Sequence, residues 1–243
     1  MEENPEDQEI LEAGKTTPQE TRYLFISDAH CERRDKDAEE IAGKVEEYGE
    51  EHECGVLLMG GDMGGSSDIK KFLETDFEEK KIVKGNHDTW WLGDFAGDKS
   101  LSDLELEAGK DYDHEEIEWE DKMYKMCLKH KPGDFNISHS TKKENEDNES
   151  WVYDIILYGH SHIPHTRCLT DGTLAICPGS IEKNNHRVEE QYKTVEGEMP
   201  ERSAHIITTF SEGVTVQHID YDEEDIVEEK LYIRENGILK PAA

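Results

Sequence analysis

Short apolar runs alternate with amphipathic segments over the first 90 residues. The run "YLFIS" at residues 23–27, the run within "CGVLLMGGD" and the run within "KIVKGNHD" are compact and apolar, which predicts three buried strands. Between them, residues 35–50 carry apolar side chains at helical spacing, and "SSDIKKFLETD" begins with capping serines, so both predict helices. This β-α-β-α-β order predicts a layered α/β fold with at least partly parallel strands.

The second half of the chain predicts mainly strands. "MYKMCLKH" and "FNISH" flank Pro-Gly-Asp at residues 132–134, which is strong turn chemistry and predicts a hairpin. "DIILYGHSH", "GTLAICPGS", "SAHIITTF" and "VTVQHIDYD" predict further strands, the last two joined by a turn at residues 211–213. The acidic residues 92–121 predict a surface loop with a short helix. We expect an acidic mobile tail at residues 1–20, one domain at 21–222, and a C-terminal extension at 223–243 whose pattern assigns no structure.

Composition adds a strongly acidic surface. The chain has 27 basic and 59 acidic residues, a net charge of −32, and 34% hydrophobic residues. The regular apolar runs argue against a disordered acidic protein, so we expect a folded, salt-adapted (halophilic) domain covered with carboxylates. Such a surface disfavours nucleic acid and anionic membranes as partners.

The five cysteines have neither an even count nor CxxC spacing, which indicates free thiols in a reducing compartment. No apolar run reaches the ~18 residues of a membrane span, and the N-terminus has no apolar signal core. We therefore expect a cytoplasmic protein without membrane contact, and the oligomeric state stays open.

Polar side chains gather where the predicted strands end. They are Asp28, His30, Asp62, Asn86, His87, Asp88, His139, His160 and His162. Residues two apart on an extended segment point to the same side, so the Asp28–His30 and His160–His162 pairs each present two ligands. The carboxyl ends of strands form the usual site crevice of an α/β sheet.

Carboxylate, imidazole and amide groups together suit Mn²⁺, Fe²⁺, Zn²⁺ or Co²⁺. There are enough ligands for two ions that share one carboxylate. Two ions about 3.5–4 Å apart can clamp a phosphate group and lower the pKa of a bridging water. The pattern thus predicts two divalent transition-metal ions, and we expect manganese first.

The blocks "DAH", "GDMGG", "GNHD", "SH" and "GHSH" resemble, in this order, those of the calcineurin-like metallophosphoesterase superfamily. The resemblance covers residues 22–220 and is closest to the small prokaryotic phosphodiesterase branch, relatives of the retromer subunit. It implies an α/β fold built as a four-layer α-β-β-α sandwich, in which two mixed sheets are flanked by helices.

The resemblance also implies roles. Asp28, His30, Asp62 and His162 would hold one metal, with Asp62 bridging to the second. Asn86, His160 and a lone histidine would complete the second metal site. His87 would face the substrate as general acid or transition-state stabiliser, oriented by Asp88; the small branch often carries Cys at the position of His87.

Two histidines compete for the lone-histidine position. His139, in "FNISHS", follows an alternating segment and precedes a small residue, so we prefer it. His130, in "MCLKHKP", fits instead if a hairpin turns at residues 120–121. The remaining histidines are expected to be hydrogen-bonded structural residues: His52, His114, His165, His186, His205 and His218.

The implied function is a metal-dependent phosphoesterase, most simply a phosphodiesterase acting on a small phosphate ester by attack of a hydroxide that bridges two metals. A non-catalytic or weakly catalytic protein-binding scaffold on the same fold, or a small nuclease, is the alternative. A scaffold would be expected to lose ligands, and a nuclease to carry basic channels.

Overall fold

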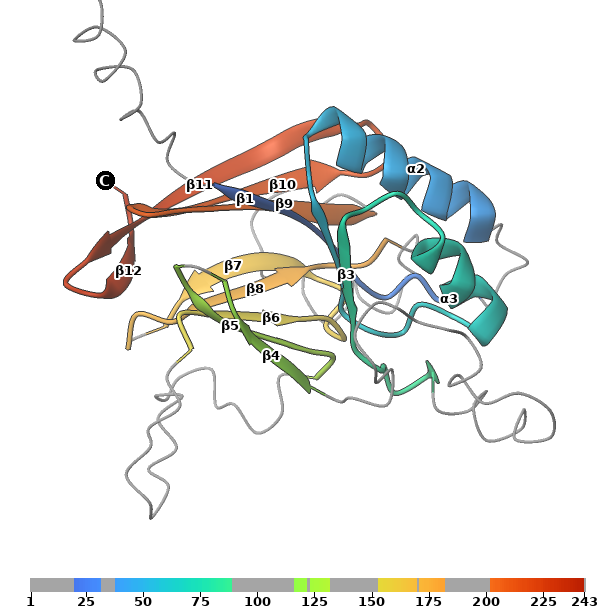
Figure 1. Ribbon diagram of the computed structural model, residues 1–243, viewed down its shortest axis with the longest axis horizontal. Helices are drawn as coiled ribbons and strands as arrows, with labels where there is room; N and C mark the ends of the chain where they lie inside the picture. Colours follow the sequence, from blue (N-terminus) through green and yellow to red (C-terminus); the bar gives the residue numbers. More distant parts are fainter. Residues whose placement is uncertain are drawn as a thin grey trace, which may run out of the picture.

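The protein is described here by a computed structural model, which describes residues 20–31, 38–88, 116–121, 123–131, 153–169, 171–181 and 202–242. These residues form two mixed β-sheets stacked face to face, with helices on the outer side of the larger one (Figure 1). The larger sheet has seven strands in the order β12-β11-β10-β9-β1-β2-β3, and the smaller has five in the order β4-β5-β6-β8-β7.

The N-terminal half builds the parallel part of the larger sheet. Strands β1 (Thr21–Ile26), β2 (Val56–Met59) and β3 (Glu79–Ile82) pair in parallel, joined by helices α2 (Ala38–Glu51) and α3 (Ser66–Leu73). The predicted β-α-β-α-β order is therefore confirmed. Because consecutive parallel strands end at the same edge, the residues after β1, β2 and β3 meet there.

The alternation along β1 divides the core into two layers. Leu24 and Ile26 pack toward the helices, in a cluster with Val45 of α2. Tyr23 and Phe25 point the other way, into the layer between the two sheets. Side chains alternate across a strand, so β1 contributes buried side chains to the core layers on both of its faces. This explains why β1 shows no polar face.

The smaller sheet corrects two predictions. Strand β4 (Glu116–Glu120) occupies part of the segment for which we expected a loop and short helix, and it pairs antiparallel with β5 (Lys125–Lys129). The turn between them is held by Asp121, whose Oδ1 accepts hydrogen bonds from the backbone N–H groups of Met123 and Tyr124. This is the turn at residues 120–121 that we weighed as the alternative.

Strand β5 is paired on both sides, with β4 and in parallel with β6 (Ile155–Tyr158). It therefore has no free edge for the predicted hairpin through residues 132–134, which lie outside the described residues. The sequence pattern misled because Pro-Gly-Asp is strong turn chemistry, whereas pairing is decided by partners distant in the chain. Strands β7 (Pro164–Cys168) and β8 (Leu174–Pro178) complete this sheet; we had not expected β7.

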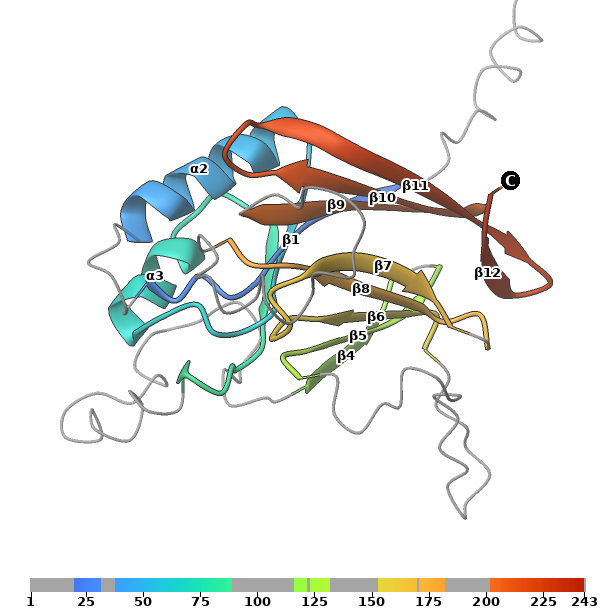
Figure 2. The ribbon, with the colours of Figure 1, turned by 180° about the vertical axis from the view of Figure 1, so that it is seen from behind.

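The C-terminal strands extend the larger sheet. As predicted, β9 (Ser203–Phe210) and β10 (Gly213–Asp220) are joined by a tight turn, and β9 pairs antiparallel with β1. The unassigned segment forms β11 (Asp225–Glu235) and β12 (Ile238–Pro241), which continue the sheet antiparallel (Figure 2). Structurally, residues 225–241 thus belong to the sheet rather than to a separate extension.

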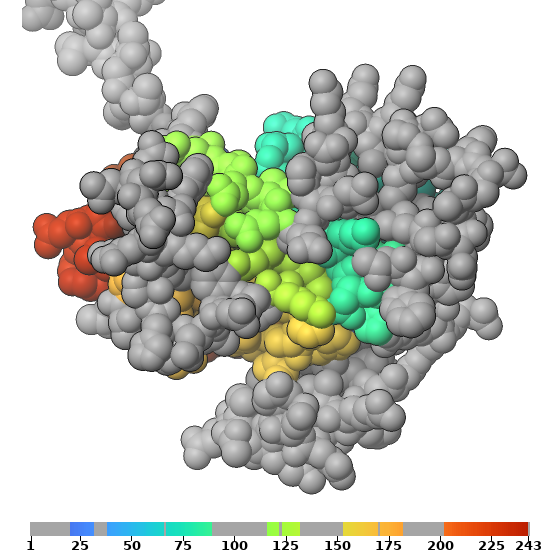
Figure 3. Space-filling view, turned by 90° about the horizontal axis from the view of Figure 1, so that it is seen from below, coloured from blue at the N-terminus to red at the C-terminus, as the bar shows by residue number. Residues whose placement is uncertain are grey.

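The predicted fold class is confirmed: two mixed sheets stack on one another, and α2 and α3 cover the outer face of the larger sheet. Within the described ranges, no helix covers the outer face of the smaller sheet. Figure 3 views the molecule from that side, with the green surface of β4 and β5 next to the turquoise surface of the β3 region. There Lys81 Nζ lies 5.1 Å from the centroid of the Trp119 ring, joining the edges of the two sheets.

Candidate metal centre

The site is assembled from the carboxyl ends of five strands, β1, β2 and β3 of the larger sheet and β5 and β6 of the smaller. The side chains are Asp28, His30, Asp62, Asn86, His87, His130, His160 and His162. Backbone hydrogen bonds tie the neighbouring ends together: Asp28 N donates to Gly61 O (3.0 Å) and His30 N to Asp62 O (2.9 Å). The two sheets are linked by His160 N, which donates to Asp28 Oδ2 (2.9 Å).

Left-handed backbone conformations gather at this site. Eight described residues other than glycine have positive φ, and five of them are predicted ligands: Asp28 (56°), His30 (44°), Asp62 (55°), His160 (65°) and His162 (56°). This conformation is costly for a residue with a Cβ and persists only where the surroundings impose it. The turns that follow β1, β2 and β6 therefore direct these five side chains into the centre of the site.

Glycine allows the strand ends to approach one another. A Cβ on Gly159 would come within 2.7 Å of Gly60 O and would overlap the Ser27 hydroxyl. A Cβ on Gly85 would overlap the backbone nitrogen of Asp62. The glycines of "GNHD" and "GHSH" are thus required by close packing of the loops that carry the ligands.

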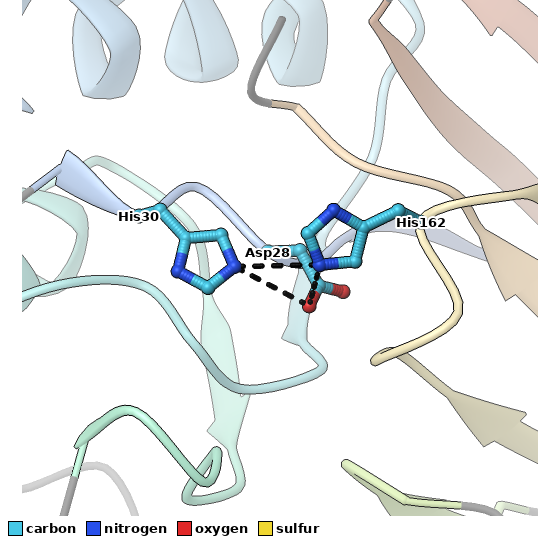
Figure 4. Close-up of side chains that lie close together, drawn as sticks. All are labelled: Asp28, His30 and His162. Carbon is cyan, nitrogen blue, oxygen red and sulfur yellow. Dashed lines mark hydrogen bonds and ion pairs between the residues drawn. The ribbon is translucent and has the colours of Figure 1, made fainter. Parts of the chain in front are cut away.

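The first cluster consists of Asp28, His30 and His162 (Figure 4). His162 Nε2 lies 3.2 Å from Asp28 Oδ1 and 3.4 Å from His30 Nε2, and His30 Nε2 lies 3.9 Å from Asp28 Oδ1. Asp28 and His30 are fully buried, whereas a quarter of the His162 side chain is exposed.

The second cluster consists of Asp62, His130 and His160. His130 Nε2 lies 3.2 Å from Asp62 Oδ2 and 3.1 Å from Asn86 Oδ1. The His130 ring is fixed from behind, because its Nδ1 lies 2.7 Å from Gly60 O. A backbone carbonyl on one ring nitrogen sets the tautomer that leaves the other nitrogen free to act as a ligand.

Asp62 connects the clusters. Its Oδ2 lies 3.2 Å from His130 Nε2 in the second cluster and 3.8 Å from His30 Nε2 in the first. Burial alone would raise the pKa of Asp62, but the hydrogen bond and positive charge of His130 outweigh it and lower the pKa to about 2. The same pairing raises the pKa of His130 against the effect of its burial, and burial together with His130 lowers the pKa of His160.

The residues present fit divalent metal ions. Asp28 Oδ1 is buried and forms no hydrogen bond with any residue that the structure describes, although Asp28 Oδ2 accepts from Ser27 Oγ (2.5 Å) and His160 N. A buried carboxylate oxygen that accepts no hydrogen bond is costly, and a cation would satisfy it. Carboxylate oxygen and imidazole nitrogen are also the donors that such metals prefer.

His87 and Asp88 follow β3 but have different surroundings. The His87 ring lies 5.2 Å from the His30 ring, centroid to centroid, and is partly exposed. Asp88 is buried, and its carboxylate accepts hydrogen bonds from the backbone N–H groups of Gly85 (2.7 Å), Asp62 (2.9 Å) and Gly64 (3.4 Å). Burial raises the pKa of Asp88 despite these bonds. Asp88 thus fastens the β3 loop to the β2 loop.

Of the nine predicted site residues, the structure brings seven together; Asp88 lies behind them, and His139 lies outside the described residues. His130, the weighed alternative, lies within the second cluster. Ser27 and Ser180 were missed, and Ser180 Oγ donates to Asp28 O (2.8 Å). No spacing signal marks these two serines, because each contacts Asp28, a predicted metal ligand, and neither is itself at the centre of the site.

A layered α/β fold with two Asp/His clusters at its strand ends defines a candidate metallohydrolase. The family profile described as "Calcineurin-like phosphoesterase superfamily domain" matches residues 22–199. This covers well over half of the chain, so the protein belongs to the calcineurin-like phosphoesterase superfamily.

Solved structures share the fold at low sequence identity. The E. coli phosphoesterase Yfce is 14% identical, with a TM-score of 0.51 over 86% of this chain and 98% of its own. Chaetomium thermophilum Vps29 is 13% identical, with a TM-score of 0.51 over 91% and 93%. Entamoeba histolytica Vps29, complexed with Zn²⁺, is 16% identical, with a TM-score of 0.50 over 91% and 97%.

A comparison with curated protein sequences gave no match. Among the described residues, no helix combines the length and apolar character needed to cross a bilayer.

Proposed function

We propose that the protein is a metal-dependent phosphoesterase that hydrolyses phosphodiesters. The observation that supports this most is the pair of Asp/His clusters joined by one carboxylate, Asp62. Two adjoining cation sites suit a substrate group whose oxygens become more negative as the reaction proceeds.

Asp28, His30, Asp62 and His162 are the proposed ligands of one metal ion. Asp62, Asn86, His130 and His160 are the proposed ligands of the other. We prefer His130 to His139, because its Nε2 lies 3.1 Å from Asn86 Oδ1 and 3.2 Å from Asp62 Oδ2.

When bound, the metal ions would supply a nucleophile at neutral pH and positive charge beside the phosphoryl oxygens. The ligand set accepts Mn²⁺, Fe²⁺, Zn²⁺ or Co²⁺, and we expect manganese to support activity best. Vps29 from Entamoeba histolytica, which shares the fold, is described with Zn²⁺.

His87 is the proposed substrate-facing residue. Its ring is partly exposed and lies against His30, and its backbone N–H donates to Asp62 Oδ1 (2.7 Å), so it has a fixed position at the rim of the first cluster. From there its imidazolium can stabilise charge on the phosphoryl group or protonate the leaving oxygen. Asp88 is proposed to act as a positioning residue, through the backbone of the β2 and β3 loops.

The experiment is a hydrolysis assay with a chromogenic phosphodiester and the matching monoester, after chelation and after addition of each metal, at low and high salt. We expect turnover only with metal, and faster turnover of the diester. His87→Ala should lower kcat by about 100-fold or more. A folded, metal-loaded protein that hydrolyses neither ester would overturn the proposal.

A protein-binding scaffold predicts that purification in Mn²⁺ yields a protein almost free of metal, which the same samples would reveal.

All five cysteines are free in the structure, in keeping with our expectation of a reducing, cytoplasmic location.

A further inference from the structure

Two histidines that belong to neither of the clusters described above face each other in the layer between the sheets. His205 of β9 and His218 of β10 are directly opposite in the antiparallel register. By strand alternation they share a face with Ile207 and Val216, which belong to the core between the sheets. His205 is 1% exposed and His218 is 9% exposed. Figure 1 shows β9, β10 and β11 running side by side above the smaller sheet.

Each of these rings has a buried nitrogen, Nδ1 in His205 and Nε2 in His218, that finds no hydrogen-bond partner within the described parts of the chain. We expected both to be hydrogen-bonded structural residues, as buried polar groups usually are. Leaving such an atom unsatisfied is costly, so two on opposing rings call for a physical reason.

The pair has the spacing of the histidine pairs in the metal clusters. The His205 and His218 ring centroids are 5.1 Å apart, compared with 5.2 Å for His30 and His162 and 5.1 Å for His130 and His160. Rings at this separation can turn one nitrogen each toward a common ion. Burial lowers the pKa of both His205 and His218, which keeps the imidazoles neutral, the form that binds a metal.

A carboxylate completes the row on the neighbouring strand. Glu228 of β11 is the register partner of His218, so His205, His218 and Glu228 lie on one face of three adjacent strands. Glu228 Oε2 now pairs with Lys230 Nζ at 2.8 Å. Both side chains are half exposed, so this ion pair contributes little and Glu228 can rotate toward the histidines at small cost.

We propose that His205, His218 and Glu228 form a further site for a divalent transition metal of the zinc class. Two imidazole nitrogens and one carboxylate are an established protein ligand set for zinc, with a fourth position left for water. The exposed Glu228 gives the ion a path from solvent. This site is separate from the proposed phosphoesterase site, and either proposal can be wrong without affecting the other.

The test compares zinc binding in the wild-type protein and His218→Gln. Each protein is chelated, dialysed against buffered free Zn²⁺ and analysed for bound metal. We expect His218→Gln to bind about one equivalent less per chain, with metal-dependent hydrolysis unchanged. His52→Gln is the matched control: His52 stacks on Tyr48 on α2, away from the row, and should bind as wild type.

Two surface variants keep the proposal testable if His218→Gln fails to fold. Glu228→Gln should weaken the binding of this one equivalent by about 10-fold or more, and Lys230→Gln, which releases Glu228, should strengthen it. Equal zinc stoichiometry and affinity in the wild type, Glu228→Gln and Lys230→Gln would overturn the proposal. So would a loss in His52→Gln as large as that in the variants of the row.

Discussion

The two candidate metal clusters are built in different ways. Asp28 and His30 of the first cluster come from a single strand end, two residues apart, and are fully buried. Each member of the second cluster comes from a different strand end: Asp62 after β2, His130 after β5 and His160 after β6. Local spacing therefore sets most of the first cluster, whereas strand pairing across both sheets sets the second.

The largest effect is expected at the carboxylate that the clusters share. Asp62→Asn keeps the shape of the side chain but removes its charge, so both clusters should bind metal more weakly. We expect kcat/KM to fall by more than about 100-fold, since changes at groups that only support ligands already cost 10–100-fold. Hydrolysis assays with metal analysis measure both consequences in one preparation.

The control for Asp62→Asn is Asp68→Asn, which alters the nearby carboxylate that accepts from Gly65 N at the start of α3. It should retain activity. Loss of metal from only one cluster in Asp62→Asn would show that Asp62 does not connect the two.

The second cluster can be tested by removing its histidine. His130→Ala should lower activity by about 10–100-fold and release one metal ion, because His130 Nε2 lies beside both Asp62 and Asn86. His139→Ala should have little effect on either quantity. The opposite outcome in metal analysis and kinetics would restore His139 as the ligand.

The sequence predicts the parts of the site that local spacing sets better than the parts that strand pairing sets. Asp28 with His30 could be inferred from two-residue spacing, and "GNHD" and "GHSH" from their glycines. His130 could be inferred only as the alternative to His139, because its position depends on β5 lying between β4 and β6, a pairing decided by partners distant in the chain. The turn signal at residues 132–134 even favoured another hairpin.

In the fold, too, some elements follow from local sequence patterns and others depend on pairing with distant strands. The β-α-β-α-β order followed from periodicity, since α2, α3, β1 and β2 bury regular sets of apolar positions, whereas β3 buries only Ile82. Strand β11 escaped prediction because seven of its eleven residues are exposed and six are charged, and its place is fixed by backbone pairing with β10.

Where the strand ends of the two clusters meet, close packing should be sensitive to a single methyl group. Gly159→Ala would push a Cβ against Ser27 and Gly60 O, so we expect a loss of about 2–3 kcal/mol of unfolding free energy. Thermal unfolding should show a Tm lowered by several degrees.

Gly43→Ala in α2 is the matched control, because a Cβ there meets nothing within 4 Å. It should stabilise the protein by about 0.5–1 kcal/mol. Equal Tm values for the two variants would contradict the packing argument.

The smallest effect is expected from the serine behind the first cluster. Ser27→Ala removes the 2.5 Å hydrogen bond to Asp28 Oδ2 and should weaken binding of one metal ion by about 10-fold, leaving the other unchanged. Calorimetric titration of the chelated protein separates the two binding steps. Equal weakening of both binding steps would mean that the Ser27 hydroxyl supports the two clusters equally.

Anomalous X-ray scattering from crystals of the Mn²⁺-loaded protein tests the central claim most directly. The account predicts two peaks about 3.5–4 Å apart, one bound by Asp28, His30 and His162, the other by His130 and His160, with Asp62 touching both. A single peak, or a second peak that His130 does not contact, would contradict it.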